Sequence, residues 1–260
     1  MTAWSRWRSW APAGTTDTGA IDPLGDLAEV AREHGAWFHV DGAYGLIDAA
    51  SPALRPAFAA VADADSVIVD PHKWLATGVG CAATYVRDAG LLLRAFAQGA
   101  AAYLEGSFSS EEHDAVVQFD SIGIPYMDMG VELSAPSRGV LAWAVLRELG
   151  RAGVAARVER HLGFARHVAQ RARQHPRPDL LLEPELSVVC FRYVASDAVN
   201  AEILLRLRRT TRSIPSSTVV GGHLAIRPCF INPHTRLADV DALVDHVTAI
   251  GDELTGTQSG

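Results

Sequence analysis

Two short apolar runs, each ending in an aspartate, lie in the first third of the chain: 37-WFHVDGAYG-45 and 66-SVIVDPHKW-74. Apolar runs of this length between polar residues, glycine or proline are typical of strands that are buried on both faces. A third run spans residues 82–86. Before them, Asp22 and Pro23 can start a helix, because an aspartate accepts free N–H groups and a proline suits the first helical turn. These segments predict an α/β fold with helices packed against a sheet.

The pattern changes after residue 137. Apolar residues at helical spacing predict one helix that ends near Gly150 and a second helix over 154–168. The elements predicted to follow are a strand over 186–193, a helix over 198–208, a strand over 224–227 and a closing helix over 240–254. We therefore divide the chain into a first domain, residues 1–136, and a small C-terminal α+β domain, residues 137–260.

A long polar segment lies near the end of the first domain, at about residues 105–128. It carries Glu111-Glu112-His113-Asp114 and only a weak apolar patch at 115–117. Loops of this length are usually functional lids or disordered segments. We predict that this segment is a lid loop.

The overall charge and hydropathy exclude several kinds of partner. The formal net charge is -7, and no basic run with interleaved aromatic residues occurs, so we predict no nucleic-acid partner. Charged residues and glycines interrupt the apolar stretches before they reach the roughly 20 residues that a bilayer requires, and residues 1–14 lack a secretory core. We therefore predict a cytoplasmic protein with no membrane partner.

The sequence predicts neither a disulfide framework nor a metal site. The cysteines are widely separated in or beside apolar runs, so we expect buried thiols: Cys81, Cys190 and Cys229. His39, Asp41 and His72 carry groups that suit several divalent ions, but no clear ligand set emerges around them.

The candidate chemistry lies where the two apolar runs end. Open α/β sheets place ligand-binding groups at strand ends, which is where Asp41 stands, although a strand-end aspartate also serves as a helix cap. Lys73 lies between two large side chains, His72 and Trp74, and a single lysine of this kind is usually structural. The pair is more informative, because covalent catalysis through an amine needs a lysine and an acid that can protonate a pyridine nitrogen.

These two motifs, preceded by Gly14-Thr15-Thr16, resemble the group II decarboxylases that depend on pyridoxal 5'-phosphate (PLP). This family includes the aromatic-L-amino-acid and glutamate decarboxylases, and the resemblance runs from about Ala13 to Leu254. It implies the type I fold of PLP-dependent transferases, also called aspartate aminotransferase-like, with a partial large domain. It also implies PLP as cofactor and an L-amino acid substrate, aromatic by analogy, that is converted to its amine and CO2.

The resemblance also assigns roles around the cofactor. Lys73 looks like the Schiff-base lysine and Asp41 like the partner of the pyridine nitrogen. Ala43 would lie against the cofactor ring, and His72 near the phosphate or the reacting carbon.

Three further residues take roles in the same way. Thr16 would lie near the cofactor or the substrate carboxylate. Asp70 stands where many relatives have an asparagine that contacts the phosphate. Tyr126 stands at the spacing of the family's lid tyrosine and would donate a proton to the carbon that loses CO2.

The chain departs from the family at its N-terminal end, where relatives carry a long portion with much of the phosphate site and of the dimer interface. This chain has only Met1 to Pro12 there, and Trp4 to Trp10 show neither a strand's nor a stable helix's pattern. We therefore expect a fragment, a homodimer if the missing portion is supplied. Two alternatives stay open: a non-catalytic remnant or interaction module, and a related PLP lyase or aldehyde synthase.

Overall fold

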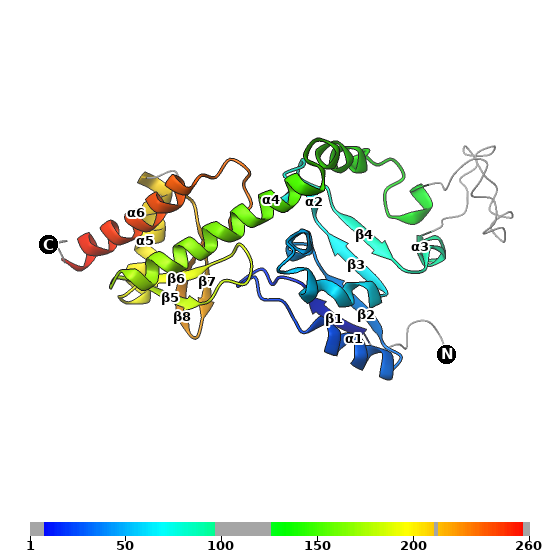
Figure 1. The fold of residues 1–260 in the computed structure, drawn as a ribbon, viewed down its shortest axis with the longest axis horizontal. Coiled ribbons are helices and arrows are strands. Elements are labelled where there is room, and N and C mark those ends of the chain that lie inside the picture. Colours follow the sequence, from blue (N-terminus) through cyan, green and yellow to red (C-terminus); the bar gives the residue numbers. More distant parts are fainter. Residues whose placement is uncertain (1–7, 97–125, 211–212, 257–260) are drawn as a thin grey trace.

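The computed structural model describes residues 8–96, 126–210 and 213–256, in which two separate four-stranded sheets lie toward opposite ends of a long helix (Figure 1). The strands of the first sheet, in spatial order, are β1 (Arg8–Pro12), β2 (Trp37–Asp41), β3 (Ser66–Val69) and β4 (Ala83–Val86). The first three strands are parallel, and β4 is antiparallel to β3. The carboxyl ends of β1, β2 and β3 therefore meet at one edge of the sheet.

Helical segments follow the strands of this sheet. They are α1 (Leu24–Glu33), η2 (Gly45–Ala50), η3 (Arg55–Asp63), α2 (Pro71–Trp74), α3 (Ala89–Phe96) and η6 (Tyr126–Met129). The predicted helix after Asp22-Pro23 is confirmed as α1, which buries Leu24 and Ala31 against Phe38 and Val40 of β2. The three predicted strands are confirmed as β2, β3 and β4.

The first strand, β1, corrects the sequence analysis. No strand was predicted within Trp4 to Trp10, yet Arg8–Pro12 pairs in parallel with the whole length of β2. Trp10 is 65% exposed, while Ala11 is fully buried, so only a small side chain marks the inner face. Main-chain hydrogen bonds to β2 form this edge strand, and such pairing leaves little signal in the side-chain pattern.

A close main-chain approach joins the segment after β1 to the start of η2. Gly14 has a φ of 107°, and a Cβ atom on Gly45 would overlap the carbonyl oxygen of Ala13. Glycine fits at position 45 because an added Cβ would meet main-chain atoms of Ala13, and Ala13 is itself bound to β2 by the 2.8 Å hydrogen bond from its N–H to Asp41 O. The Gly14-Thr15-Thr16 motif is thereby fixed beside the residues that follow β2.

Replacing Gly45 by alanine is expected to lower the free energy of unfolding by about 1–3 kcal/mol, because the added methyl group overpacks this contact. Gly25 is the matched control, since nothing lies within 4 Å of a Cβ at that position in α1. Urea unfolding should show Gly45→Ala destabilised and Gly25→Ala no less stable than the wild type. Equal stability of the two variants would contradict the close approach.

The long helix, α4 (Arg138–Gln174), contains a break at Gly150, where φ is 61° and ψ is 176°. The predicted end of a helix near Gly150, followed by a second helix, is confirmed.

The remaining elements are β5 (Pro178–Leu182), β6 (Cys190–Tyr193), α5 (Asp197–Thr210), β7 (Ser216–Val220), β8 (His223–Arg227) and α6 (Leu237–Thr255). The four strands form an antiparallel sheet of order β5-β6-β8-β7, and α5 and α6 lie beside it.

The second sheet partly departs from the predicted elements. The strand predicted over 186–193 is shorter than expected, and Val188 forms only an isolated bridge with Cys229. Strands β5 and β7 were not predicted. The division between residues 136 and 137 stays a prediction, with α4 starting at Arg138.

An apolar cluster connects the two sheets. Tyr44 and Trp74 from the first part pack with Val158 and Leu162 of α4 and with Leu186. Tyr44 and Trp74 belong to the two sequence motifs, so this cluster packs against the carboxyl edge of the first sheet.

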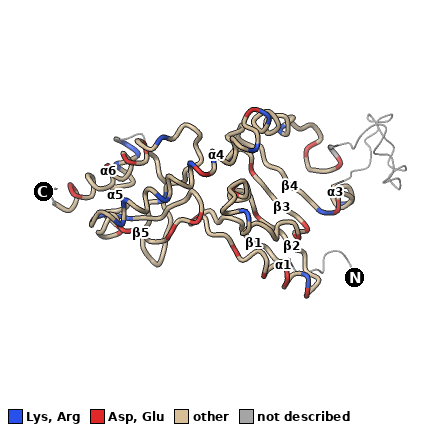
Figure 2. The backbone as a smooth tube through the Cα atoms, viewed as in Figure 1, with Lys and Arg blue, Asp and Glu red and all other residues tan. Residues whose placement is uncertain are grey.

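Charged residues of both signs are scattered over both parts of the chain (Figure 2). Among the described residues, no helix combines the length and the apolar character needed to cross a membrane. All three cysteines are free; Cys81 and Cys190 are buried, as predicted, and Cys229 is partly buried.

Candidate active site

Three sequence motifs meet at the carboxyl edge of the first sheet. Gly14-Thr15-Thr16 follows β1, Asp41 ends β2, and Asp70 to Trp74 follow β3. Besides the Ala13–Asp41 hydrogen bond, Asp70 N donates to the carbonyl oxygen of Ala43 over 3.3 Å. The main chain thus holds the motifs of β2 and β3 side by side.

Lys73 lies in α2, the single helical turn after β3, with 32% of its side chain exposed. Its Nζ lies 2.9 Å from Oδ2 of Asp70. It is also the only lysine in the whole sequence. This signal was available in the sequence: the one side-chain amine of the chain stands at the edge where open α/β sheets bind ligands.

Asp41 lies at the end of the neighbouring strand and is partly exposed. Its Oδ1 accepts the N–H of Ala43 over 3.1 Å. No ion pair to Asp41 is found in the part of the chain that the structure describes. This hydrogen bond holds Ala43 beside the Asp41 carboxylate.

A hydrogen bond to the main chain holds the ring of His72 in place. Nδ1 donates to the carbonyl oxygen of Cys81 over 2.8 Å, and because a carbonyl only accepts, Nδ1 carries the proton. Nε2 then faces Oδ2 of Asp70 at 3.9 Å, beyond hydrogen-bond distance. Asp70 is thus brought to Lys73 and His72, and its contact with a phosphate stays a prediction.

Aromatic residues behind these motifs were missed by the sequence analysis as parts of the site. Trp74 is fully buried and stacks on Tyr44, with ring centroids 6.0 Å apart. The Tyr44 hydroxyl shares a 2.6 Å hydrogen bond with Ser187, and burial raises the pKa of Tyr44 well above its ordinary value. Arg157 of α4 donates to the carbonyl oxygens of Trp74 and Leu75, each over 3.3 Å. Helix α4 and the segment between β5 and β6 therefore support the turn that carries Lys73.

A buried carboxyl group lies in the same region. Asp48 of η2 is fully buried, and neither of its oxygens has a hydrogen-bond partner among the described residues. Burial, together with the nearby Glu159 carboxylate, raises the pKa of Asp48 to about 8. Burial also lowers the pKa of His161 in α4 to about 4. Both groups are therefore neutral at pH 7.

Thr16 lies on an exposed turn that the second sheet holds in place. Arg227 of β8 donates to the carbonyl oxygens of Thr16 and Asp17, the latter over 2.9 Å. Ser216 accepts a further hydrogen bond from Arg227. Arg227 therefore holds this turn against the second sheet, and no hydrogen bond joins the Thr16 hydroxyl to Lys73 or Asp41.

The predicted lid and its tyrosine lie largely outside the described residues. Tyr126 begins η6, but its side chain is not described, so its role as a proton donor stays a prediction.

The metal-binding alternative gains no support. Nδ1 of His39 lies 2.7 Å from the Ser66 hydroxyl, which also accepts from Trp37. Within residues 8–96, 126–210 and 213–256, no three histidine, cysteine or acidic side chains form a group suited to a metal ion.

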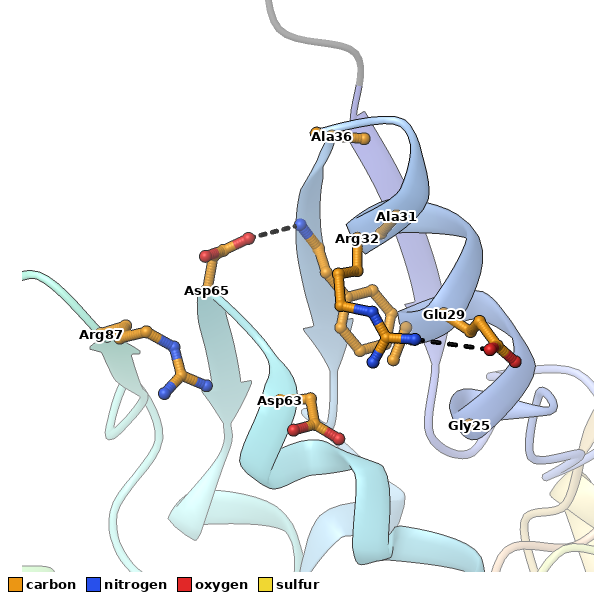
Figure 3. Close-up of a pocket in the computed structure, with 11 residues that line it drawn as sticks. Gly25, Glu29, Ala31, Arg32, Ala36, Asp63, Asp65 and Arg87 are labelled. Carbon is orange, nitrogen blue, oxygen red and sulfur yellow. Dashed lines mark hydrogen bonds and ion pairs between the residues drawn. The ribbon is translucent and has the colours of Figure 1, made fainter.

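Two cavities lie away from this edge. One of about 550 Å³ opens between α1 and the start of β3 (Figure 3). Several of its charged groups have partners: Asp65 accepts the N–H of Phe38 over 2.9 Å, and Arg32 pairs with Glu29. The other, of about 490 Å³, lies beside β1 and α1. Neither is lined by Lys73 or Asp41.

Comparisons with known proteins agree with this arrangement. Residues 9–194 match the pyridoxal-dependent decarboxylase conserved domain. The chain is 29% identical to an acidic amino acid decarboxylase of Xenopus tropicalis, over 94% of this chain and 49% of the relative. It is 31% identical to a tryptophan decarboxylase of Camptotheca acuminata, over 84% of this chain and 43% of the relative. The chain thus spans about half the length of the curated relatives it matches.

A solved structure shows the same fold. The crystal structure of Oryza sativa TDC with PLP and tryptamine matches with a TM-score of 0.81 and 27% identity, over 94% of this chain and 50% of that chain. The predicted type I fold of PLP-dependent transferases is confirmed, as a partial copy. The chain belongs to the pyridoxal-dependent decarboxylase family, whose cofactor is PLP.

Proposed function

We propose that the chain carries out PLP-dependent decarboxylation of an L-amino acid, to an amine and CO2, with Lys73 as the residue that holds the cofactor. One observation carries the proposal: the only lysine of the sequence and the Asp41 carboxylate, which forms no ion pair with any described residue, stand at the carboxyl ends of adjacent parallel strands. PLP, when bound, supplies a ring that accepts the electrons released as CO2 leaves.

The described residues fit the amine and ring parts of the cofactor. One oxygen of the Asp41 carboxylate accepts the N–H of Ala43, and no described residue forms an ion pair with this carboxylate, so it can keep a ring nitrogen protonated. Lys73 has a partly exposed amine, and Ala43 presents a small side chain beside Asp41. The phosphate is fitted less well, because the group nearest Lys73 is the Asp70 carboxylate, which cannot donate.

The remaining roles follow the resemblance. His72 is proposed to act near the phosphate or the reacting carbon, and its fixed ring would present Nε2 there. Tyr126 is proposed to donate a proton to the carbon that loses CO2, and Thr16 to lie near the cofactor or the substrate carboxylate. A lid formed by about residues 105–128 would exclude water until that proton is delivered.

The proposed substrate is an aromatic L-amino acid. The relative from Camptotheca acuminata, named a tryptophan decarboxylase, supports it, whereas the relative from Xenopus tropicalis is named for acidic amino acids and is similarly identical. Assays with aromatic and with acidic L-amino acids decide between the two substrate classes. Identifying the product as an amine or an aldehyde distinguishes a decarboxylase from an aldehyde synthase.

A second candidate is a non-catalytic interaction module. It is favoured by exposed apolar side chains around the start of α4, among them Val131, Leu133 and Val140, and by Trp143, which is 61% exposed. Exposed apolar patches often mark protein interfaces. The same residues support the proposed homodimer, and the three free cysteines support a reducing, cytoplasmic location.

Release of labelled CO2 from carboxyl-labelled L-tryptophan, L-tyrosine, L-glutamate and L-aspartate, with added PLP, tests the proposal. Asp41→Asn is expected to lower the rate by about 100-fold or more, because it removes the charge that stabilises the protonated ring. Asp63→Asn, an exposed aspartate outside the site, is the control and should match the wild type. Release no faster than from PLP in buffer would support the interaction module instead.

A further inference from the structure

We propose that Asp70 is a positioning residue that holds the Lys73 amine in an ion pair and thereby slows its reaction with a carbonyl group. The inference deepens the proposed function, since it rests on Lys73 as the residue that reacts.

The geometry is that of a partly buried ion pair. Nζ of Lys73 lies 2.9 Å from Oδ2 of Asp70, and the two side chains are 32% and 12% exposed. Ion pairs that are partly buried are screened less by salt than exposed ones. Main-chain hydrogen bonds fix both residues, because Asp70 N donates to Ala43 O and Lys73 N donates to Asp70 O over 3.0 Å.

The direction of the Asp70 side chain supports a dedicated role. Asp70 stands at the N-cap of α2, where an aspartate ordinarily accepts an N–H of the first helical turn. No such side-chain hydrogen bond is formed, and the carboxylate is instead directed to Lys73.

Other charged groups near the pair do not replace it. His72 approaches Oδ2 only to 3.9 Å, and its ring is held by the carbonyl oxygen of Cys81. Cys229 is near enough for the Lys73 charge to lower its pKa, although burial has the larger effect and raises it. Lys73 is thus the nearest cation to Asp70 in the described part of the chain.

The pair must separate before the amine reacts. Nζ loses its extra proton and uses its lone pair to bond the carbonyl carbon of an aldehyde. The carbonyl oxygen then leaves as water with the two remaining protons of the nitrogen, and a C=N bond forms. A carboxylate held at 2.9 Å opposes this sequence by the energy of the ion pair, whereas an amide of the same shape does not.

Reductive methylation tests this without any cofactor. Formaldehyde forms the C=N bond, and cyanoborohydride delivers hydride to its carbon, which leaves a methyl group on the nitrogen. Because Lys73 is the only lysine, the N-terminal amine of the same molecule is an internal reference for the rate, read by peptide mass. Asp70→Asn is expected to raise the ratio of Lys73 to N-terminal methylation by about fivefold at fixed pH.

Two variants make the result specific. Asp70→Glu keeps the charge and should restore the slow rate, which a purely structural role would not predict. Asp88→Asn removes an exposed aspartate that pairs with Arg94 and should leave the ratio unchanged. An unchanged or lower ratio in a folded Asp70→Asn protein, as judged by circular dichroism, would overturn the proposal. Failure of PLP to attach to Lys73 would count against the proposed function alone, because the methylation ratio does not depend on PLP.

Discussion

Asp48→Asn is expected to stabilise the fold by about 4 kcal/mol at pH 7, an unusually large gain for one substitution. Asp48 is fully buried, both of its oxygens lack hydrogen-bond partners in the described structure, and its pKa is raised to about 8. The ionisable groups near Asp48 are Glu159, Tyr44 and Cys229. None of them carries a positive charge that could compensate a negative charge on Asp48. Folding at pH 7 therefore requires Asp48 to bind a proton, whereas an asparagine is neutral at every pH.

The sign of the pH dependence follows from proton binding. Between about pH 4 and pH 8 the folded state keeps the Asp48 proton while the unfolded chain has lost it, because the pKa is raised from 3.8 to about 8 on folding. Stability therefore falls as the pH rises through this window, by about 1.4 kcal/mol per unit, and levels off above pH 8. Below about pH 4 Asp48 is protonated in both the folded and the unfolded state, so it no longer makes the stability depend on pH.

Urea unfolding at pH 5, 6, 7 and 8 measures the effect as the difference between Asp48→Asn and the wild type. The difference removes the opposing contribution of His161, whose pKa is lowered to about 4. Glu159→Gln should give a smaller gain, since it removes the like charge near Asp48. Parallel pH profiles for the wild type and Asp48→Asn would show that the carboxyl group is not buried in this way.

Much of the fold could be predicted because the side chains that become buried recur at regular spacing along the sequence. Every second residue of β2 is buried, three of the four residues of β3 are buried, and Gly150 breaks α4 where the helical spacing is interrupted. Strand β1 could not be predicted, because an edge strand is specified by main-chain pairing with β2 and carries exposed side chains such as Trp10.

The site was predictable where its residues follow the strands directly. Asp41 and Lys73 could be placed together because parallel strands align their carboxyl ends. The hydrogen bond of Tyr44 to Ser187 and the proximity of Asp48 to Glu159 join segments far apart in the sequence, so no local pattern announces them.

The central claim is that Lys73 holds the cofactor, and trapping the attached cofactor tests it most directly. Purified chain is mixed with PLP, reduced with borohydride and mapped by peptide mass, for the wild type and for Lys73→Ala. Lys73 carries the only side-chain amine in the sequence, so any label lies either there or at the N-terminus. We predict one adduct on the peptide that contains Lys73, with an absorbance band that Lys73→Ala lacks. Equal labelling of the two proteins, confined to the N-terminal amine, would contradict the claim.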